Sequence, residues 1–148
     1  MRFLLLPPIA LVMLAGLMLA LHRTVPVMGV VPSPFNWAGM VPIVAGLGLA
    51  NWHARLFRRI GTNINTFGDP DKLTTEGLFG RSRNPMYLGM LACLIGTAIL
   101  LGSLTPWVGP VAFFVIANLW YIPLEERAMA RKFGPAYAEY RQRVRRWL

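Results

Sequence analysis

The sequence predicts an all-α protein, an integral membrane bundle of about four transmembrane helices with a cytoplasmic amphipathic helix at its C-terminus. Hydrophobic residues make up 55% of the 148 residues and charged residues only 14%, whereas soluble domains contain about 25% charged residues. The charges are also gathered between long uncharged runs, as expected where hydrocarbon excludes ionised side chains. We expect residues 1–148 to form a single domain.

The first two uncharged runs each contain one predicted span. Residues 3–21 carry no charge and approach the roughly 20 residues that one crossing needs. The second run opens with three prolines, which do not lie inside helices, so its span is predicted at residues 35–57. Arg2 before the first run would also suit a signal peptide, but no small-x-small cleavage site follows. We therefore interpret the first run as an uncleaved helix.

A third uncharged run, residues 84–124, is about twice as long as one crossing requires. The turn-forming residues at its middle are Gly102, Ser103, Thr105 and Pro106. Such a cluster marks a tight turn, so the run is predicted to form a hairpin of two spans, at residues 85–102 and 106–124.

The distribution of positive charge predicts the orientation. All 15 Lys and Arg residues except Arg23 lie near the termini or between Arg55, at the end of the second span, and the start of the third span. Because positive residues favour the cytoplasmic side, both termini and the central loop are expected there, in a protein of the bacterial inner membrane. The net charge is +9, and the basic residues flank the spans instead of forming a separate basic domain. This distribution favours anionic lipid over nucleic acid as the partner.

The C-terminal tail, residues 125–148, is predicted to be helical in two parts. Gly134 and Pro135 interrupt it, so the fourth span should continue to about Lys132, break, and resume to the end of the chain. The apolar residues that recur at helical spacing in the second part are Tyr137, Tyr140, Val144 and Trp147. This pattern predicts a helix lying in the membrane interface.

A first candidate site surrounds the start of the third span. Asn84 followed by Pro85 is a typical helix start, in which Asn accepts a bond from a free backbone N–H. With Arg81 and Arg83 beside it, this positive helix end suits an anion. The alternative is that Asn84 only caps, the arginines only set topology, and Tyr87 only belongs to the aromatic belt.

A second candidate site is the carboxylate pair Glu125 and Glu126 at the inner end of the fourth span. The residues three and four positions later are Ala128, Met129 and Ala130, so neither carboxylate has a basic partner on its own helix. Their partners must come from elsewhere, from Arg81 and Arg83 or from a ligand. A structural salt bridge between helices fits this pattern as well as a ligand site does.

Together the two sites resemble a known family. The sequence LTTEGLFGRSRNPMYLG, followed one hairpin later by PLEERAMARKFGPAYAEYRQRVRRWL, is similar to membrane methyltransferases typified by isoprenylcysteine carboxyl methyltransferase and phosphatidylethanolamine N-methyltransferase. The shared patterns are Arg-x-Pro-x-Tyr-x-Gly, Glu-Glu and Phe-Gly-x-x-Tyr-x-x-Tyr, within about the last half of the chain.

The resemblance implies S-adenosylmethionine as cofactor and a lipid or isoprenoid acceptor, either a carboxylate or an amine, methylated at the cytoplasmic face. The cofactor-binding residues that it implies are Arg83, Asn84, Pro85, Tyr87, Gly89, Glu125 and Glu126. Arg127 and Arg131 are the candidates for catalytic anchors, because a guanidinium binds a carboxylate or phosphate bidentately. Asn84 departs from the His usual in eukaryotic members, and an amide cannot titrate.

Other functions are less consistent with the sequence. A membrane reductase using NADPH has related architecture but more spans, and a small multidrug transporter needs an acid within a span, where none lies here. A scaffold without activity would leave the carboxylate pair unexplained. His53 has no second His or Cys at metal-ligand spacing, so no metal site is predicted.

Overall fold

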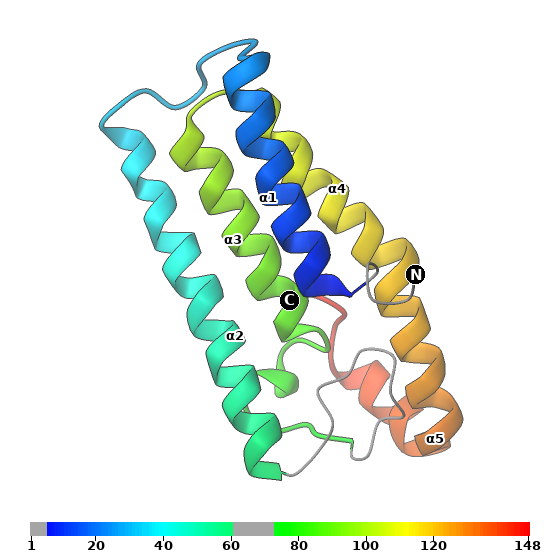
Figure 1. The fold of residues 1–148 in the computed structure, drawn as a ribbon. Coiled ribbons are helices and arrows are strands. Elements are labelled where there is room, and N and C mark those ends of the chain that lie inside the picture. The colour runs from blue at the N-terminus through cyan, green and yellow to red at the C-terminus, as the bar shows by residue number, and fades with distance from the viewer. Residues whose placement is uncertain (1–5, 61–72) are drawn as a thin grey trace.

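A computed structural model describes residues 6–60 and 73–148. Within these ranges the chain is helical and contains no named strand, which confirms the all-α prediction (Figure 1). The α-helices are α1 (Pro7–Thr24), α2 (Met40–Ile60), α3 (Pro85–Leu101), α4 (Val108–Ile116) and α5 (Ile122–Arg143). The short helices are the 3-10 turns η2 (Phe35–Gly39), η3 (Gly77–Gly80) and η4 (Thr105–Trp107), and the π-helical turn η5 (Ala117–Tyr121).

Prolines and glycines set most of these boundaries. α1 starts at Pro7 and α3 at Pro85, since proline is favoured in the first helical turn. The first span was predicted at residues 3–21, and α1 ends instead at Thr24. α3 ends before Gly102, whose φ of 75° is a left-handed conformation that suits glycine, so the hairpin turn lies where it was predicted.

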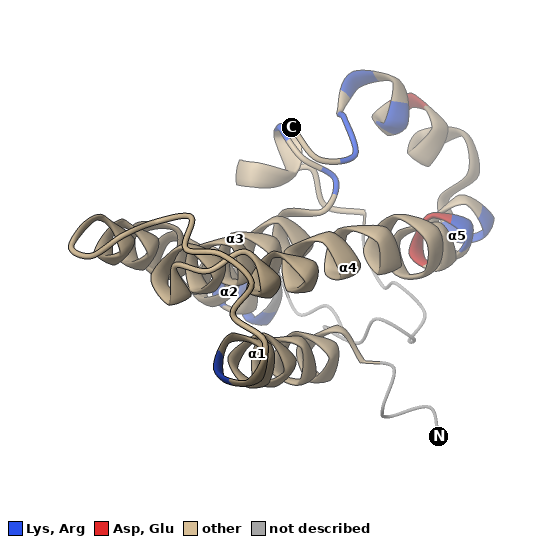
Figure 2. Cartoon of the chain, turned by 90° about the horizontal axis from the view of Figure 1, so that it is seen from above, with Lys and Arg blue, Asp and Glu red and all other residues tan. Residues whose placement is uncertain are grey.

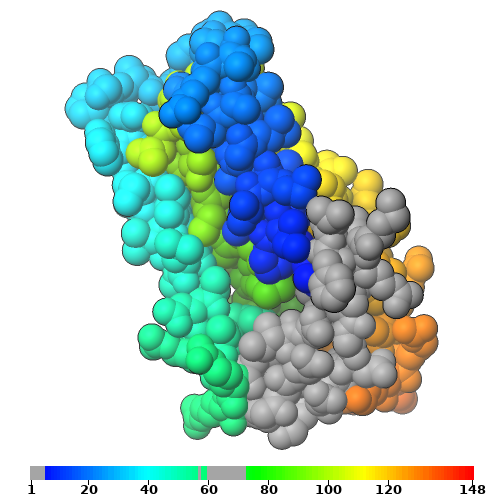
Figure 3. Space-filling model, in the orientation of Figure 1, coloured from blue at the N-terminus to red at the C-terminus, as the bar shows by residue number. Residues whose placement is uncertain are grey.

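α3 is the central helix, and glycines bring α2 against it. A Cβ atom added at Gly46 would collide with the carbonyl oxygen of Gly89, and one at Gly96 would collide with that of Gly39. Two helices with small residues at the contact can approach closely. In the space-filling view, α3 is seen only in the strip between α1 and α2 (Figure 3).

Within residues 6–60 and 73–148, two helices are long and apolar enough to cross a membrane: α1 and the continuous helix Thr105–Arg143. Large apolar side chains such as Val12, Val41 and Leu119 point outward, each more than two thirds exposed. Soluble proteins rarely expose large contiguous apolar patches, so these surfaces suit a lipid environment. Charges gather on α5, on the C-terminal segment and at the end of α2, whereas α1 carries only Arg23 (Figure 2).

The tail differs from its prediction in two ways. The break falls at Gly134 (φ 47°, ψ −120°), as expected, but α5 ends at Arg143 and Val144 is extended, so the helix does not continue to the end of the chain. The residues of the predicted interfacial face, Tyr137, Tyr140 and Val144, are buried within the protein beside Leu73, Met129 and Phe133. The last residues, 144–148, return to the start of α3, where backbone bonds to other segments replace helical ones.

The second part of α5 also contacts the short helix η3. The Tyr140 hydroxyl donates a hydrogen bond of 2.7 Å to the carbonyl of Phe79, and burial raises the pKa of Tyr140 to about 12. Trp52 and His53 of α2 pack against the Phe79 ring at centroid distances of 6.2 and 5.7 Å. These contacts join α2, η3 and the second part of α5.

Candidate active site

The residues at the start of α3 bind the C-terminal segment. The backbone N–H groups of Arg83 and Asn84 donate to the Arg145 carbonyl at 3.0 Å and to Ser82 Oγ at 3.2 Å. The Asn84 side chain makes no cap bond, and its Nδ2 donates to the carbonyl of Arg146 at 3.0 Å. Asn84 is the N-cap residue of α3, as predicted, but its side chain accepts no capping bond from the backbone, because its amide instead binds the carbonyl of the returning chain.

Glu126 is held by two arginines from different segments. Its Oε1 accepts from Arg83 Nη2 at 3.0 Å and from Arg146 Nε at 3.2 Å, and its Oε2 accepts from Arg146 Nη2 at 2.7 Å. The side chains of Glu126 and Arg83 are only 11% and 10% exposed. The missing local partner of Glu126 is thus supplied in part by Arg83, as one of the open interpretations required, and in part by Arg146.

Glu125 has a different environment from its neighbour. The Tyr87 hydroxyl donates to Glu125 Oε1 at 2.7 Å, and this is the one hydrogen bond that the described residues give this carboxylate. Burial raises the pKa of Glu125 to about 7; the Tyr87 bond lowers it and the charge of Glu126 raises it further. Glu125 is therefore the carboxylate of the pair that retains capacity for a ligand.

Tyr137 is a neighbour of this site that the site prediction did not include. Its side chain is buried, and its pKa is raised by burial first and then by the negative charge of Glu126, while Arg83 and Arg141 lower it. The charges that shift the pKa of Tyr137 therefore include Glu126 on α5 and Arg83 before α3, the two residues that form the ion pair of the site. Its signal in the sequence was the Phe-Gly-x-x-Tyr pattern, which was noted without a role.

The remaining predicted residues lie apart from this cluster. Arg127 and Arg131 are exposed on α5 and form no ion pair with another described residue. Gly89 faces α2, where an added Cβ would lie 3.0 Å from the Gly46 carbonyl oxygen, and Pro85 forms the first turn of α3. The structure thus joins Arg83, Asn84, Tyr87, Glu125 and Glu126, and gives Pro85 and Gly89 backbone roles.

Comparison with known proteins identifies the family. The model of the phospholipid methyltransferases matches residues 35–136, which include both halves of the site. The chain belongs to the phospholipid methyltransferase family. The resemblance found in its sequence is therefore confirmed.

Individual relatives of this family member include proteins from bacteria and plants. It is 40% identical over 63 residues to an uncharacterised protein of Haemophilus influenzae, covering 43% of this chain and 100% of that one. It is 38% identical over 76 residues to protein-S-isoprenylcysteine O-methyltransferase B of Arabidopsis thaliana, covering 49% of this chain.

A third relative is a probable protein-S-isoprenylcysteine O-methyltransferase of Oryza sativa subsp. indica, 36% identical over 114 residues and covering 74% of this chain. The matches span only 37% and 58% of the lengths of the Arabidopsis and rice enzymes. No solved structure matches this chain.

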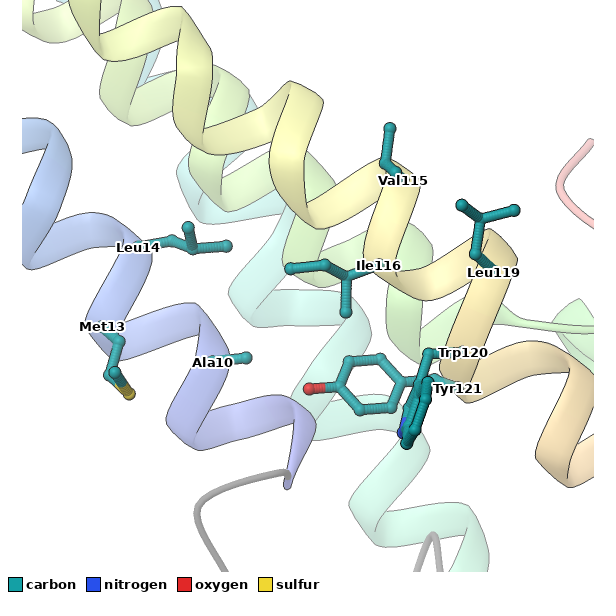
Figure 4. A pocket seen from close by; sticks show the side chains of 8 residues that line it. All are labelled: Ala10, Met13, Leu14, Val115, Ile116, Leu119, Trp120 and Tyr121. Carbon is teal, nitrogen blue, oxygen red and sulfur yellow. The ribbon is translucent and has the colours of Figure 1, made fainter.

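An apolar groove opens beside the polar site of this family member. It has a volume of about 520 Å³ and lies between α1 and the end of α4 with η5 (Figure 4). Its lining side chains are Ala10, Met13, Leu14, Val115, Ile116, Leu119, Trp120 and Tyr121. The Tyr121 ring stacks on Tyr87 at a centroid distance of 5.9 Å and an interplanar angle of 5°. Tyr87 therefore contacts Glu125 with its hydroxyl and the groove-lining Tyr121 with its ring.

Sequence reasoning missed this groove and also missed Arg146. The groove depends on η5, and π-helical turns, which often occur at functional sites, have no simple residue signature. The sequence predicted a helix that continues through Arg146 to the end of the chain. No pattern in the residues marked the extended turn at Val144 that sends Arg146 inward.

Proposed function

We propose that the protein is an S-adenosylmethionine-dependent methyltransferase that transfers a methyl group to a lipid-like or isoprenoid acceptor at the cytoplasmic face of the membrane. Family membership supports methyl transfer. The observation that carries the proposal is the position of Tyr87, which joins the half-buried carboxylate of Glu125 to an apolar groove. A polar cofactor and an apolar acceptor would meet at this side chain.

The polar groups that remain available fit this cofactor. Its ammonium and ribose hydroxyls need an acceptor, and Glu125 Oε2 accepts no hydrogen bond from the described residues. Its carboxylate needs a donor, and the buried Nε of Arg83 has no hydrogen-bond partner in the described part of the chain. Glu125 and Arg83 would hold the cofactor from opposite ends. When bound, the cofactor supplies an electrophilic methyl group.

The groove supports an apolar acceptor. All eight of its lining residues have apolar or aromatic side chains, on two helices that carry exposed apolar residues. An aliphatic or isoprenoid chain lying there would gain about 25 cal/mol for each Å² removed from water. The reactive end of the acceptor would then lie near Tyr121, with water excluded by the surrounding aromatic rings.

The chain's own residues would mainly position and desolvate the reactants. A carboxylate acceptor attacks the methyl carbon directly, so this reaction needs orientation more than proton transfer. An amine acceptor must first lose a proton. Glu125, with a pKa of about 7, is the group that would act as the general base for this step. Arg127 and Arg131, exposed one turn apart on α5, are proposed to bind the acceptor's carboxylate or phosphate.

We also propose that the protein crosses a bacterial inner membrane four times, with both termini cytoplasmic. Apolar outward faces on α1, α2 and α4 support the crossings. The charged groups on α5 and the C-terminal segment support a cytoplasmic position for that end (Figure 2).

Binding and transfer test the proposal separately. Purified full-length protein in detergent should bind S-adenosylmethionine in calorimetry, and Glu125→Gln should weaken that binding while the exposed control Glu139→Gln leaves it unchanged. Membranes containing the protein should transfer label from methyl-labelled cofactor to extractable lipid. Base-labile label released as methanol would indicate a carboxyl ester, and base-stable label an amine or carbon product. Absence of cofactor binding by the wild-type protein would refute the proposal.

A further inference from the structure

We propose that Arg146 is a positioning residue of this methyl-transfer site, which holds Glu126 so that Glu125 alone of the pair faces the cofactor. The inference rests on the proposed function. Arg146 lies outside residues 35–136, the part of the chain that matches the family model. It reaches the site only because the C-terminal segment, residues 144–148, returns to the start of α3.

The contact between Arg146 and Glu126 is a fork. Arg146 donates through Nη2 to Oε2 at 2.7 Å and through Nε to Oε1 at 3.2 Å, and Arg83 donates to Oε1 from the other side. Both oxygens of Glu126 are therefore occupied by guanidinium donors. Two-point contact of this kind fixes the plane of a carboxylate as well as its position.

Arg146 is itself held on both sides by contacts that do not involve Glu126. Its carbonyl accepts from Asn84 Nδ2 at 3.0 Å, and Val144 is buried with the tyrosines of α5. Trp147 Nε1 donates to Asn118 Oδ1 at 3.1 Å, and its ring stacks on Phe114 at 5.2 Å. The guanidinium is thus presented by an anchored backbone, as preorganised support of a binding site requires.

The consequence for Glu125 is electrostatic and geometric. Glu125 and Glu126 are adjacent on α5, and the charge of Glu126 raises the pKa of Glu125. The groups that face the pair are Tyr87 from α3, Tyr137 from the second part of α5, Arg83 before α3 and Arg146 from the C-terminal segment. Without Arg146, less positive charge offsets Glu126, so Glu125 should ionise at higher pH.

Arg143, the last residue of α5, supplies a matched control three residues before Arg146. It pairs with Glu139 at 3.7 Å, one helical turn away, and both side chains are more than two thirds exposed. Exposed pairs contribute little to stability, so Arg143→Gln removes the same charge as Arg146→Gln without disturbing the site.

The test uses full-length protein in detergent and S-adenosylmethionine as the probe, with calorimetry between about pH 5 and pH 9. At neutral pH, Arg146→Gln should weaken binding at least about tenfold, Arg146→Lys should be intermediate, and Arg143→Gln should match wild type. The pH midpoint of binding should move upward in Arg146→Gln and downward in Glu126→Gln. Since a Lys ammonium keeps the charge but not the fork, Arg146→Lys tests the geometry in a variant that preserves the ion pair.

Two results would be decisive against different statements. Wild-type affinity and an unshifted pH midpoint in both Arg146 variants would overturn the positioning role while leaving the proposed function intact. Failure of the wild-type protein to bind the cofactor would overturn the proposed function itself. If Arg146→Gln does not fold, the affinity of Arg146→Lys decides the question alone, since that variant keeps the charge but loses the fork.

Discussion

The Tyr87 hydroxyl donates a 2.7 Å hydrogen bond to Oε1 of Glu125 and so joins the start of α3 to the start of α5. Tyr87 is buried, Glu125 is half-buried, and the Tyr87 ring stacks on Tyr121. A carboxylate with one donor on one oxygen is well oriented but not saturated. Its remaining oxygen is the acceptor that the proposed cofactor site requires.

Removing the Tyr87 hydroxyl should weaken cofactor binding most at neutral pH. The hydrogen bond lowers the pKa of Glu125, so Tyr87→Phe should raise it and leave a smaller fraction ionised near pH 7. We expect several-fold weaker S-adenosylmethionine binding at pH 7 and a smaller difference near pH 9, where Glu125 is ionised in both proteins. A loss of equal size at both pH values in calorimetry would contradict this account.

The raised pKa of Glu125 also predicts how the stability of the unliganded protein depends on pH. The pKa of Glu125 is 4.5 in the unfolded chain, and burial raises it to about 7 in the folded protein. Folding therefore favours the protonated form of Glu125. Its contribution is fully present below about pH 4.5 and is lost as pH rises through 7. Glu125→Gln mimics the protonated form and should be more stable than wild type at pH 8, by up to roughly 3 kcal/mol.

Thermal unfolding in detergent at pH 5 and pH 8 measures this difference. The control is Glu139→Gln, which removes an exposed carboxylate 70% accessible to solvent on the same helix. The stability of Glu139→Gln should depend on pH as that of wild type does, whereas the stability of Glu125→Gln should change less between pH 5 and pH 8. If the stability of Glu125→Gln changes with pH as much as that of wild type, other groups cause the pH dependence.

The outcome at α3 and at Glu126 shows what sequence can predict. Pro85 and Gly102 give local signals for a helix start and end, so the span predicted at 85–102 appears as a helix over Pro85–Leu101. Glu126 lacked a partner on its own helix, which correctly directed attention to Arg83. Both conclusions depended on short-range rules that the tertiary structure did not override.

The errors have the opposite cause. The capping bond expected of the Asn84 side chain is absent because Arg146, 62 positions later in the chain, brings a carbonyl to its amide. The end of α5 was misplaced because residues 144–148 bind the start of α3 instead, for example through the Arg83 N–H and the Arg145 carbonyl. Such long-range partners leave no periodic pattern in the residues, so they follow only from the folded chain.

Filling the apolar groove should separate acceptor binding from cofactor binding. The Ile116 side chain projects between α1 and α4 (Figure 4), and Ile116→Trp would occupy part of the groove. We expect methyl transfer to membrane lipid to fall at least about tenfold while S-adenosylmethionine affinity stays near wild type. Val111→Trp, on an exposed part of the same helix outside the groove, is the control. Equal transfer by both variants would show that the acceptor lies elsewhere.

The contact between α2 and α3 can be tested with two glycines on one helix. A Cβ at Gly46 would meet the Gly89 carbonyl oxygen and the Cys93 sulfur, whereas a Cβ at Gly48 meets no atom within 4 Å. Gly46→Ala should therefore force the helices apart and cost about 1–3 kcal/mol, as overpacking does. Gly48→Ala should be neutral or stabilise by up to about 1 kcal/mol, because alanine favours helix.

Thermal unfolding of both variants in the same detergent compares these energies directly. Because α3 carries Tyr87 and follows Arg83, a displaced α3 should also weaken cofactor binding in Gly46→Ala but not in Gly48→Ala. Equal stability of the two variants would mean that α2 is free to shift along α3. In that case the close approach of the helices would not be what positions the start of α3 beside the two carboxylates.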